Sequence, residues 1–344
     1  MQTIETIKEM LKTSPEYETF RTSDKVKNGL HILCLSGSYA YGTNREDSDV
    51  DIRGVTSLAP YYANGYLSDW EVKSFSETDT TIYSYRKLIR MLSKGNPDTL
   101  GIVGQDIDKY FVLSDLGKEL IEKHSDFIGA DGVYSSFIGY ANAQMRRLEL
   151  AELGRLTNKK ELAKEIKTNI LTNAMFNMHT KYQSVETDNM NIKFKVPNDF
   201  NEDIILESVS AKNISMNDFF DVAKDFKHIV SSFGDKGKRN TKKTDFKLNK
   251  HCMHTVRGML MGIECLETGR VRTYREKDLP LLKSILNGEW MLENGKMKQE
   301  FYELIEKLRK EALYAYKNTV LPRVPDEKKV SDMMTEFVLY DLKK

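Results

Sequence analysis

Two aspartates separated by one residue follow a Gly-Ser pair by about ten positions. The segment LSGSYAYGTNREDSDVDIRGV, residues 35–55, contains Gly37 and Ser38 and then Asp49 and Asp51. Side chains two positions apart in a strand point the same way, so these carboxylates are expected to converge at the start of a strand. Two such charges repel unless a cation neutralises them, and oxygen ligands suit Mg²⁺ or Mn²⁺. The pair therefore predicts a divalent metal site.

Gly37 and Ser38 predict a seat for a phosphate group. The glycine supplies a tight turn, and Ser38 is expected at the start of a short helix, where free backbone N–H groups bind anions. The serine hydroxyl suits a phosphate oxygen or a helix cap equally well. A phosphate seat beside a metal-binding acid pair is typical of sites that split a nucleoside triphosphate by in-line attack.

The combined pattern resembles the signature of the DNA polymerase β nucleotidyltransferase superfamily, in which Gly-Ser and Asp-x-Asp each lie beside a strand. Each half alone is common at turns, and only the combination is specific. The chain is similar to one branch, the predicted nucleotidyltransferases of bacteria and phages, some encoded beside RNA ligases. The similar segments are TIYSYRKLIRMLSKGNPDTL, FIGYANAQMRR and KLNKHCMHTVRGMLMGIECLETGRV. Gly101 departs from the branch, whose members usually carry a glutamate there.

The resemblance and the helical spacing beyond residue 115 together predict an α+β fold, with a polymerase-β-like nucleotidyltransferase domain over residues 1–115 and a helical domain over 116–344. It implies a small mixed sheet with helices, and metal ions bridged by the aspartate pair. It also implies a third catalytic and metal-binding carboxylate on an adjacent strand. Asp79, at the head of DTTIY, is the candidate, and Glu77 is the alternative.

Short apolar runs predict the strands that position these acids. A third strand is expected after a long loop that contains one hairpin, and the sheet is expected to end by residue 83. The first residues and the segment after residue 84 have helical spacing, as does nearly everything beyond residue 115. The expected strands cover residues 30–35, 49–56 and 78–83, the loop 59–77, and a basic, Gly-containing loop 234–250.

A basic stripe lies on the helix expected from residue 249. Lys250, His254 and Arg257 fall at i, i+4 and i+7, and we interpret them as phosphate ligands, the alternative being a solvated helix face. Tyr140 and Gln144 share a face of an earlier helix. They suit either core packing or contact with the nucleotide base.

Composition limits the other function classes. The 344 residues carry a net charge of +1, so any attraction to nucleic acid must be local. Three cysteines without paired spacing favour a reducing, cytoplasmic location, and the sequence predicts no membrane span, no signal peptide and no structural zinc. The motifs of P-loop and serine acyl-transfer enzymes are missing from the sequence.

The leading hypothesis is a Mg²⁺- or Mn²⁺-dependent nucleotidyltransferase. It is expected to move a nucleoside monophosphate from an NTP to a hydroxyl acceptor with release of pyrophosphate. The family neighbourhood favours an RNA or tRNA 3′ end as the acceptor. A protein or small-molecule acceptor, as in AMPylation, is the alternative, and an inactive nucleotide-binding sensor is a third possibility.

Overall fold

The computed structural model describes most of the chain in two compact units. The larger unit combines residues 1–144, 249–291 and 297–344, and the smaller contains 145–248 and 292–296. The larger unit holds both an N-terminal sheet and C-terminal helices. The boundary predicted between residues 115 and 116 stays a prediction. The described residues are 2–27, 29–57, 71–156, 190–195, 205–211 and 244–343, with positions 215, 216, 219, 220, 223 and 224.

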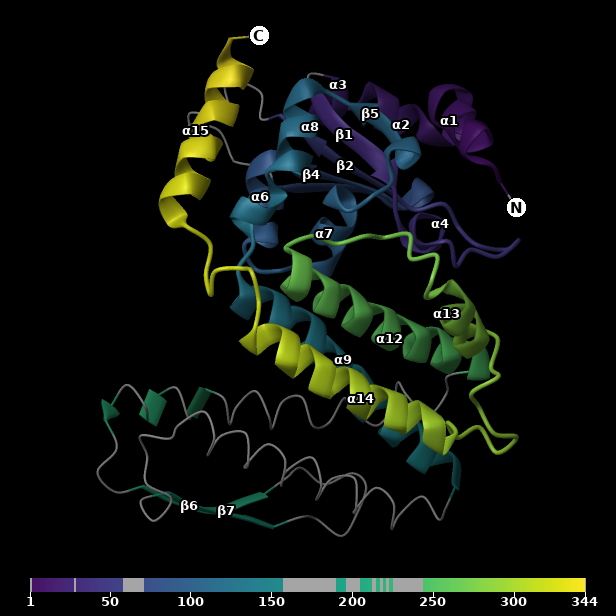
Figure 1. Cartoon of the computed structure of the whole chain (residues 1–344), viewed down its shortest axis with the longest axis vertical. Helices are drawn as coiled ribbons and strands as arrows, with labels where there is room; N and C mark the ends of the chain where they lie inside the picture. The colour runs from purple at the N-terminus through teal and green to yellow at the C-terminus, as the bar shows by residue number, and fades with distance from the viewer. Residues whose placement is uncertain are drawn as a thin grey trace. The chain divides into compact units, whose positions relative to one another are not determined.

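A five-stranded mixed sheet forms the N-terminal part, in the order β3-β4-β2-β1-β5 (Figure 1). The central pair, β1 (Leu30–Leu35) and β2 (Ile52–Thr56), is antiparallel, and β4 (Thr80–Ser84) runs parallel to β2. The edges are β3 (Val72–Phe75), antiparallel to β4, and β5 (Tyr110–Leu113), antiparallel to β1. This mixed sheet, followed by a helical region, confirms the predicted α+β fold.

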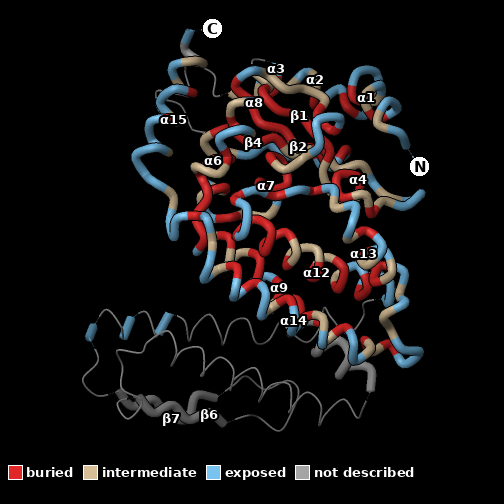
Figure 2. Tube along the Cα trace, viewed as in Figure 1, coloured by how far each residue is buried: buried red, intermediate tan, exposed pale blue. Residues whose placement is uncertain are grey.

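The core of this part lies along the central strands. Ile32, Ile52 and Ile82 have no exposed surface, and the buried segments gather on β1, β2 and β4 in Figure 2. The strand register places Ile52 and Ile82 on one face of the sheet and Ile32 on the other, so the sheet is buried on both faces. The compact apolar run LHILCL forms β1 as predicted.

Helices predicted from apolar spacing form at the expected places. In α1 (Ile4–Thr13) the side chains of Ile7 and Leu11 are buried, and Thr3 caps the helix. In α6 (Tyr85–Leu92) the apolar residues at helical spacing, Tyr85, Leu88, Ile89 and Leu92, are the buried ones. Asn96 then accepts backbone hydrogen bonds at the start of α7 (Pro97–Val103), so the Gly-Asn-Pro segment begins a helix after the preceding one ends.

The sheet differs from the sequence prediction at three places. β2 begins at Ile52 and not at residue 49, because Leu35, the last residue of β1, pairs with Ile52 and leaves no partner for an earlier start. The third predicted strand begins at Thr80, and its hairpin partner is β3. The sheet does not end by residue 83, since β5 joins its edge beside β1.

The rest of the chain is mainly helical. Gly262 on α12 lies against Phe137 on α9, where an added Cβ would stand 2.7 Å from the phenylalanine Cβ. Arg309 on α14 donates to Asn142 on α9 at 3.1 Å. Among the described helices, none combines the length and apolar character that a membrane span requires. The longer helices are α8 (Asp115–Glu122), α9 (Ala130–Leu156), α12 (Asp245–Thr268), α13 (Leu279–Leu286), α14 (Gln299–Lys317) and α15 (Glu327–Leu342).

The short elements complete the architecture. Two antiparallel strands form a second sheet in the smaller unit. The sequence did not predict this sheet, because nearly all of the chain beyond residue 115 was expected to be helical. Three short helices, one of them directly after β1, complete the N-terminal part. The second sheet contains β6 (Met190–Lys195) and β7 (Ile205–Ala211), and the short helices are α2 (Glu18–Thr22), α3 (Asp24–Lys27) and α4 (Gly37–Tyr41).

The helix α15 returns to the N-terminal part of the chain. Phe337 is fully buried, and its ring meets that of Tyr85 with centroids 5.8 Å apart. Tyr340 stacks edge-on against His31 of β1 at 6.0 Å. Segments far apart in the sequence therefore share one core within the larger unit.

Candidate active site

The turn between β1 and α4 brings the two halves of the motif together. Gly37 has φ +55°, in the left-handed region that side chains disfavour, and begins α4. A Cβ added at Gly37 would overlap Oδ2 of Asp51. The Ser36 N–H also donates to the Asp51 carbonyl at 2.8 Å. Glycine is thus required at position 37 for the backbone turn and for the close approach of the Asp51 carboxylate.

Asp51 and Asp79 lie at the starts of neighbouring parallel strands. The register pairs Ile52 with Thr80, and the Ile52 N–H donates to the Asp79 carbonyl at 3.3 Å. Each aspartate therefore precedes its strand at the same edge of the sheet. Glu77 lies in the 3₁₀ helix Ser76–Thr78, farther from the paired position, so this geometry favours Asp79 as the third acid.

Charge and burial act together on Asp51. Its pKa is raised mainly because burial disfavours the ionised form. The Asp79 and Asp49 carboxylates raise it further, whereas the Arg53 and Lys250 cations lower it. The ionised Asp51 is therefore incompletely compensated by the neighbouring side chains.

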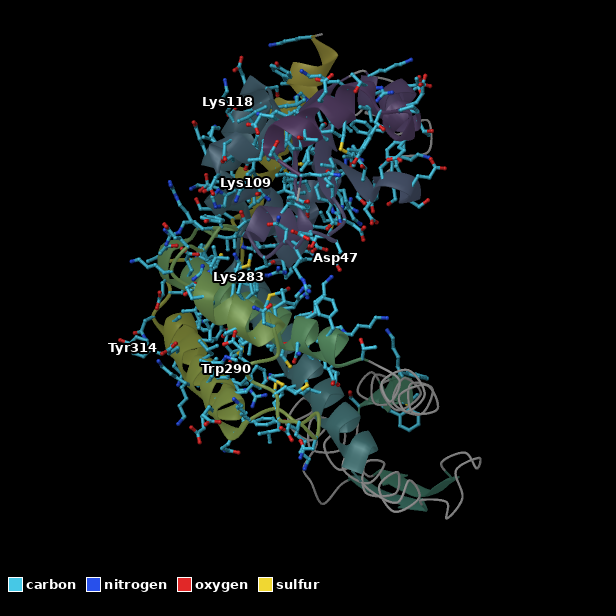
Figure 3. All side chains as sticks on the ribbon, turned by 90° about the vertical axis from the view of Figure 1, so that its right-hand side faces the viewer. Asp47, Lys109, Lys118, Lys283, Trp290 and Tyr314 are labelled. Atoms are coloured by element: carbon cyan, nitrogen blue, oxygen red, sulfur yellow. The ribbon has the colours of Figure 1, made fainter. Side chains whose placement is uncertain are left out.

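Asp49 occupies a different place from the one predicted. It is exposed and precedes β2 by three positions, so the side-chain alternation of a strand does not align it with Asp51. Its charge still raises the pKa of Asp51, so it lies within electrostatic reach. Asp47, labelled in Figure 3, belongs to the same loop and is also exposed.

The acids fit a hard divalent cation in donor type but do not form a ready-made metal site. Carboxylate oxygens are the ligands that Mg²⁺ and Mn²⁺ prefer. A bound cation would neutralise the Asp51 carboxylate, which the neighbouring side chains compensate incompletely. Over the described ranges, however, no three Asp, Glu, His or Cys residues are grouped closely enough to hold a metal ion. The metal-binding roles of Asp49, Asp51 and Asp79 stay predictions.

The basic stripe on α12 faces the Gly-Ser helix and the acids. The Arg257 guanidinium lies 3.6 Å from the centre of the Tyr41 ring, and Tyr41 is the last residue of α4. Lys250 lies near enough to Asp51 to lower its pKa. The structure thus brings this stripe to the same end of the sheet as Gly37.

The cations of the stripe form no ion pair with an acid among the described residues. Within the described part of the chain, neither Lys250 nor Arg257 forms an ion pair, and the buried Nε of Arg257 has no hydrogen-bond partner. Burial, together with the positive charges of Arg257 and Lys250, lowers the pKa of His254 to about 3. Two cations and a neutral imidazole therefore line this side of the site, an arrangement suited to an anionic group.

Ser38 is half-buried in the first turn of α4, and its hydroxyl makes no hydrogen bond to any other described residue. Ser36, one residue before Gly37, is the N-cap residue of α4, and its side chain makes no capping bond. The Ser38 hydroxyl is therefore not used as a helix cap. Its role as a phosphate ligand stays a prediction.

Sequence reasoning missed two cations that support the site. Lys109 is buried, donates from Nζ to the Ala40 carbonyl at 2.9 Å and lies 4.3 Å from the Tyr274 ring centre (Figure 3). Nothing in the local pattern of Lys109 distinguishes it from a surface lysine. Arg53 lies two positions after Asp51. Side chains two positions apart in a strand point the same way, so the rule applied to the aspartates also predicts Arg53 beside Asp51.

The remaining candidates occupy mixed environments. Gly101, on α7, faces the Tyr41 hydroxyl, which would lie 3.0 Å from an added Cβ, so a larger side chain there would press on Tyr41. Tyr140 is 42% exposed, which argues against a core role. Gln144 is buried, and its Oε1 has no hydrogen-bond partner in the described structure.

Of the predicted loop 234–250, residues 234–243 lie outside the described residues, and 245–250 form the first turns of α12.

The fold and the acid-bearing strand edge define a class, the DNA polymerase β-like nucleotidyltransferases. Residues 7–168 match the model of the RNA repair pathway DNA polymerase beta family (RlaP), so this part of the chain is similar to that family. The matched stretch contains Gly37 and the acids of the site, whereas the basic stripe on α12 lies beyond it. No curated protein and no solved structure matches the chain.

Proposed function

We propose that this protein transfers a nucleoside monophosphate from an NTP to a hydroxyl at an RNA 3′ end, tRNA included, and releases pyrophosphate. The observation that carries the proposal is the contact between Gly37 and the Asp51 carboxylate. It brings the turn that we expect to bind phosphate next to Asp51, in a chain whose residues 7–168 match a family of the RNA repair pathway. The cations of α12 at the same site, which form no ion pair among the described residues, support a polyphosphate ligand.

The proposed roles follow the positions of the side chains. Asp49, Asp51 and Asp79 would hold Mg²⁺ or Mn²⁺, which when bound neutralises the charge that develops on the phosphate oxygens. The α4 turn with Gly37 and Ser38 would hold the triphosphate from one side. Asp79 would also accept the proton of the acceptor hydroxyl.

The α12 stripe would complete the triphosphate seat from the other side. Arg257, whose guanidinium lies 3.6 Å from the Tyr41 ring centre, would offer parallel N–H groups to a phosphate, and Lys250 would offer a point charge. His254 would donate or accept a single hydrogen bond as a neutral imidazole, because its pKa is about 3. Loss of Arg257 is expected to weaken NTP binding more than it slows the transfer step.

The test is incorporation of label from α-³²P-NTPs, offered one at a time with Mg²⁺ or Mn²⁺, into RNA and into protein. The double variant Asp49→Asn, Asp51→Asn should lose transfer by at least about 10³-fold while it keeps its fold, since it removes charge without changing shape. Asp47→Asn is the matched control, an exposed acid of the same loop, and should retain full activity.

Three results would count against the proposal. Undiminished turnover in the double variant would remove the acids from the mechanism. Label in protein alone would replace the RNA acceptor by a protein hydroxyl while it leaves nucleotidyl transfer in place. The absence of transfer to any acceptor, with NTP binding retained, would identify a nucleotide-binding sensor.

A further inference from the structure

The backbone of Asp79 adopts an uncommon conformation. Its φ of 43° and ψ of 34° lie in the left-handed region, and it is the one non-glycine residue with positive φ in the described ranges. Aspartate adopts this region more often than most residues, but the conformation is uncommon and is favoured where surrounding contacts stabilise it. We therefore expect the residues around Asp79 to supply the contact that stabilises its backbone and so sets the direction of its side chain.

Arg53 supplies that hold from the neighbouring strand. Its Nη1 donates to the Asp79 carbonyl at 2.9 Å and to the Ile52 carbonyl at 2.9 Å, so one guanidinium nitrogen spans the start of β2 and the turn before β4. The Asp79 carbonyl also accepts from the Ile52 N–H. The turn is thus fixed to β2 from its backbone side, and the Asp79 carboxylate forms no hydrogen bond or ion pair with another described residue.

Arg53 also stands beside Asp51, but at the limit of ion pairing. Its Nη2 lies 4.0 Å from Oδ1 of Asp51, longer than its hydrogen bonds to the two carbonyls. The Arg53 guanidinium therefore interacts mainly with the backbone of the Asp79 turn, and its contact with the Asp51 carboxylate is the weaker one. These two roles predict opposite effects of its removal on a bound cation.

We propose that Arg53 is a positioning residue that holds the Asp79 turn against the start of β2, so that Asp79 can join Asp51 in binding a divalent cation. This inference rests on the proposed function, because it takes the acids as the cation site. If the hydrogen bonds of Arg53 to the Asp79 turn matter more, loss of Arg53 weakens cation binding, because Asp79 turns away. If the positive charge of Arg53 beside Asp51 matters more, the same loss strengthens cation binding, because a competing cation has been removed.

The test is a double-mutant cycle read by Mn²⁺ binding to the full chain, measured by electron paramagnetic resonance and calorimetry without NTP. Arg53→Met should raise the Mn²⁺ dissociation constant by about 10-fold or more, as loss of residues that orient metal ligands does. Asp79→Ala should do so at least as strongly. In the Asp79→Ala background, Arg53→Met should have no further effect, because Arg53 acts through Asp79.

Arg21→Met is the matched control. Arg21 also donates from Nη1 to two backbone carbonyls, those of Leu11 and Ser14, and is similarly exposed, but its contacts lie among the N-terminal helices. This variant should keep wild-type Mn²⁺ affinity. Arg53→Lys, which retains the charge without the fork, provides a second variant if Arg53→Met folds poorly, and its affinity should fall between wild type and Arg53→Met.

The outcomes separate this inference from the proposed function. Unchanged or tighter Mn²⁺ binding by Arg53→Met, with wild-type binding that Asp51→Asn abolishes, overturns the role of Arg53 alone. A full additional loss in the Asp79→Ala background also overturns it. Wild-type protein that binds no Mn²⁺, or binds it equally well after Asp51→Asn, overturns the cation site itself and with it both proposals.

Discussion

At the scale of single residues, the two sides of the site carry opposite charges. Burial raises the pKa of Asp51, while burial and neighbouring cations lower that of His254 to about 3. Both groups are therefore shifted toward their neutral forms in the folded protein. A ligand that brings a cation to Asp51 and phosphates to α12 would relieve both shifts.

His254 should make the free protein less stable in mild acid. The unfolded histidine binds a proton below about pH 6.5, whereas the folded one resists protonation down to a pKa of about 3. Stability is therefore fully present above pH 6.5 and falls as the pH drops. The expected contribution is a loss of about 2 kcal/mol between pH 7 and pH 5.

Urea unfolding of wild type and His254→Gln at the two pH values measures this contribution. The variant should lose about 2 kcal/mol less than wild type. The buried His124, whose pKa is also lowered by burial, is present in both proteins and cancels in the comparison. Equal losses in the two proteins would mean that His254 is protonated in the folded state near its ordinary pKa.

The residues of the candidate site could be predicted from the sequence, but the contacts that hold them in place could not. Gly37 and Asp51 have a recognisable spacing, and the structure places them in contact. The role of Arg53 depends on the left-handed backbone at Asp79, which follows from tertiary hydrogen bonds rather than from local sequence. The Arg257 contact with Tyr41 joins positions more than 200 residues apart, beyond any periodicity.

At the scale of elements, the turn between β1 and α4 determines whether the site can form. Gly37→Ala places a side chain in the left-handed region, which costs about 1–2 kcal/mol, and displaces the Asp51 carboxylate. We expect a loss of stability of at least that size and loss of nucleotidyl transfer, measured by denaturant unfolding and by the α-³²P-NTP assay.

Gly139→Ala is the matched control for the turn. Gly139 lies inside α9, is exposed, and has no atom within 4 Å of an added Cβ. Alanine is a better helix former than glycine, so this variant should gain about 0.5–1 kcal/mol of stability and keep its activity. Equal effects of the two substitutions would show that the backbone at position 37 tolerates a side chain.

Helices were predicted more accurately than strand ends. The buried face of α6 follows directly from its 3.6-residue period. β5 has four residues, too few for a period of two to be distinguished from other structure, so its pairing with β1 was missed. The late start of β2 reflects where its partner ends, which the sequence of β2 does not contain.

At the scale of the whole molecule, the helix α15 completes the core beside α6. Phe337→Ala removes a fully buried ring from Tyr85 and should cost about 3–5 kcal/mol of stability. Leu339→Ala, on the same helix but 49% exposed, should cost less than about 0.5 kcal/mol. Thermal and urea unfolding compare the two, and equal losses would mean that α15 does not dock through Phe337.

The family match and the compact units divide the chain differently. The match ends at residue 168, whereas the larger unit continues from residue 249 and includes α12, α14 and α15. The sequence predicted helices in this region but could not predict that they pack into the same unit as the sheet, because contacts between distant segments leave no local pattern. The basic stripe on α12 is part of this late contribution.

The contact between Phe337 and Tyr85 has a consequence for synthesis on the ribosome. The strands and α6 emerge first, but the ring that covers Tyr85 is added about 250 residues later. At about 5–20 residues per second, the nascent sheet waits roughly 10–50 s for this cover. During that interval Tyr85 lacks the Phe337 ring, and we expect the newly made N-terminal part to bind chaperones until translation has passed Phe337.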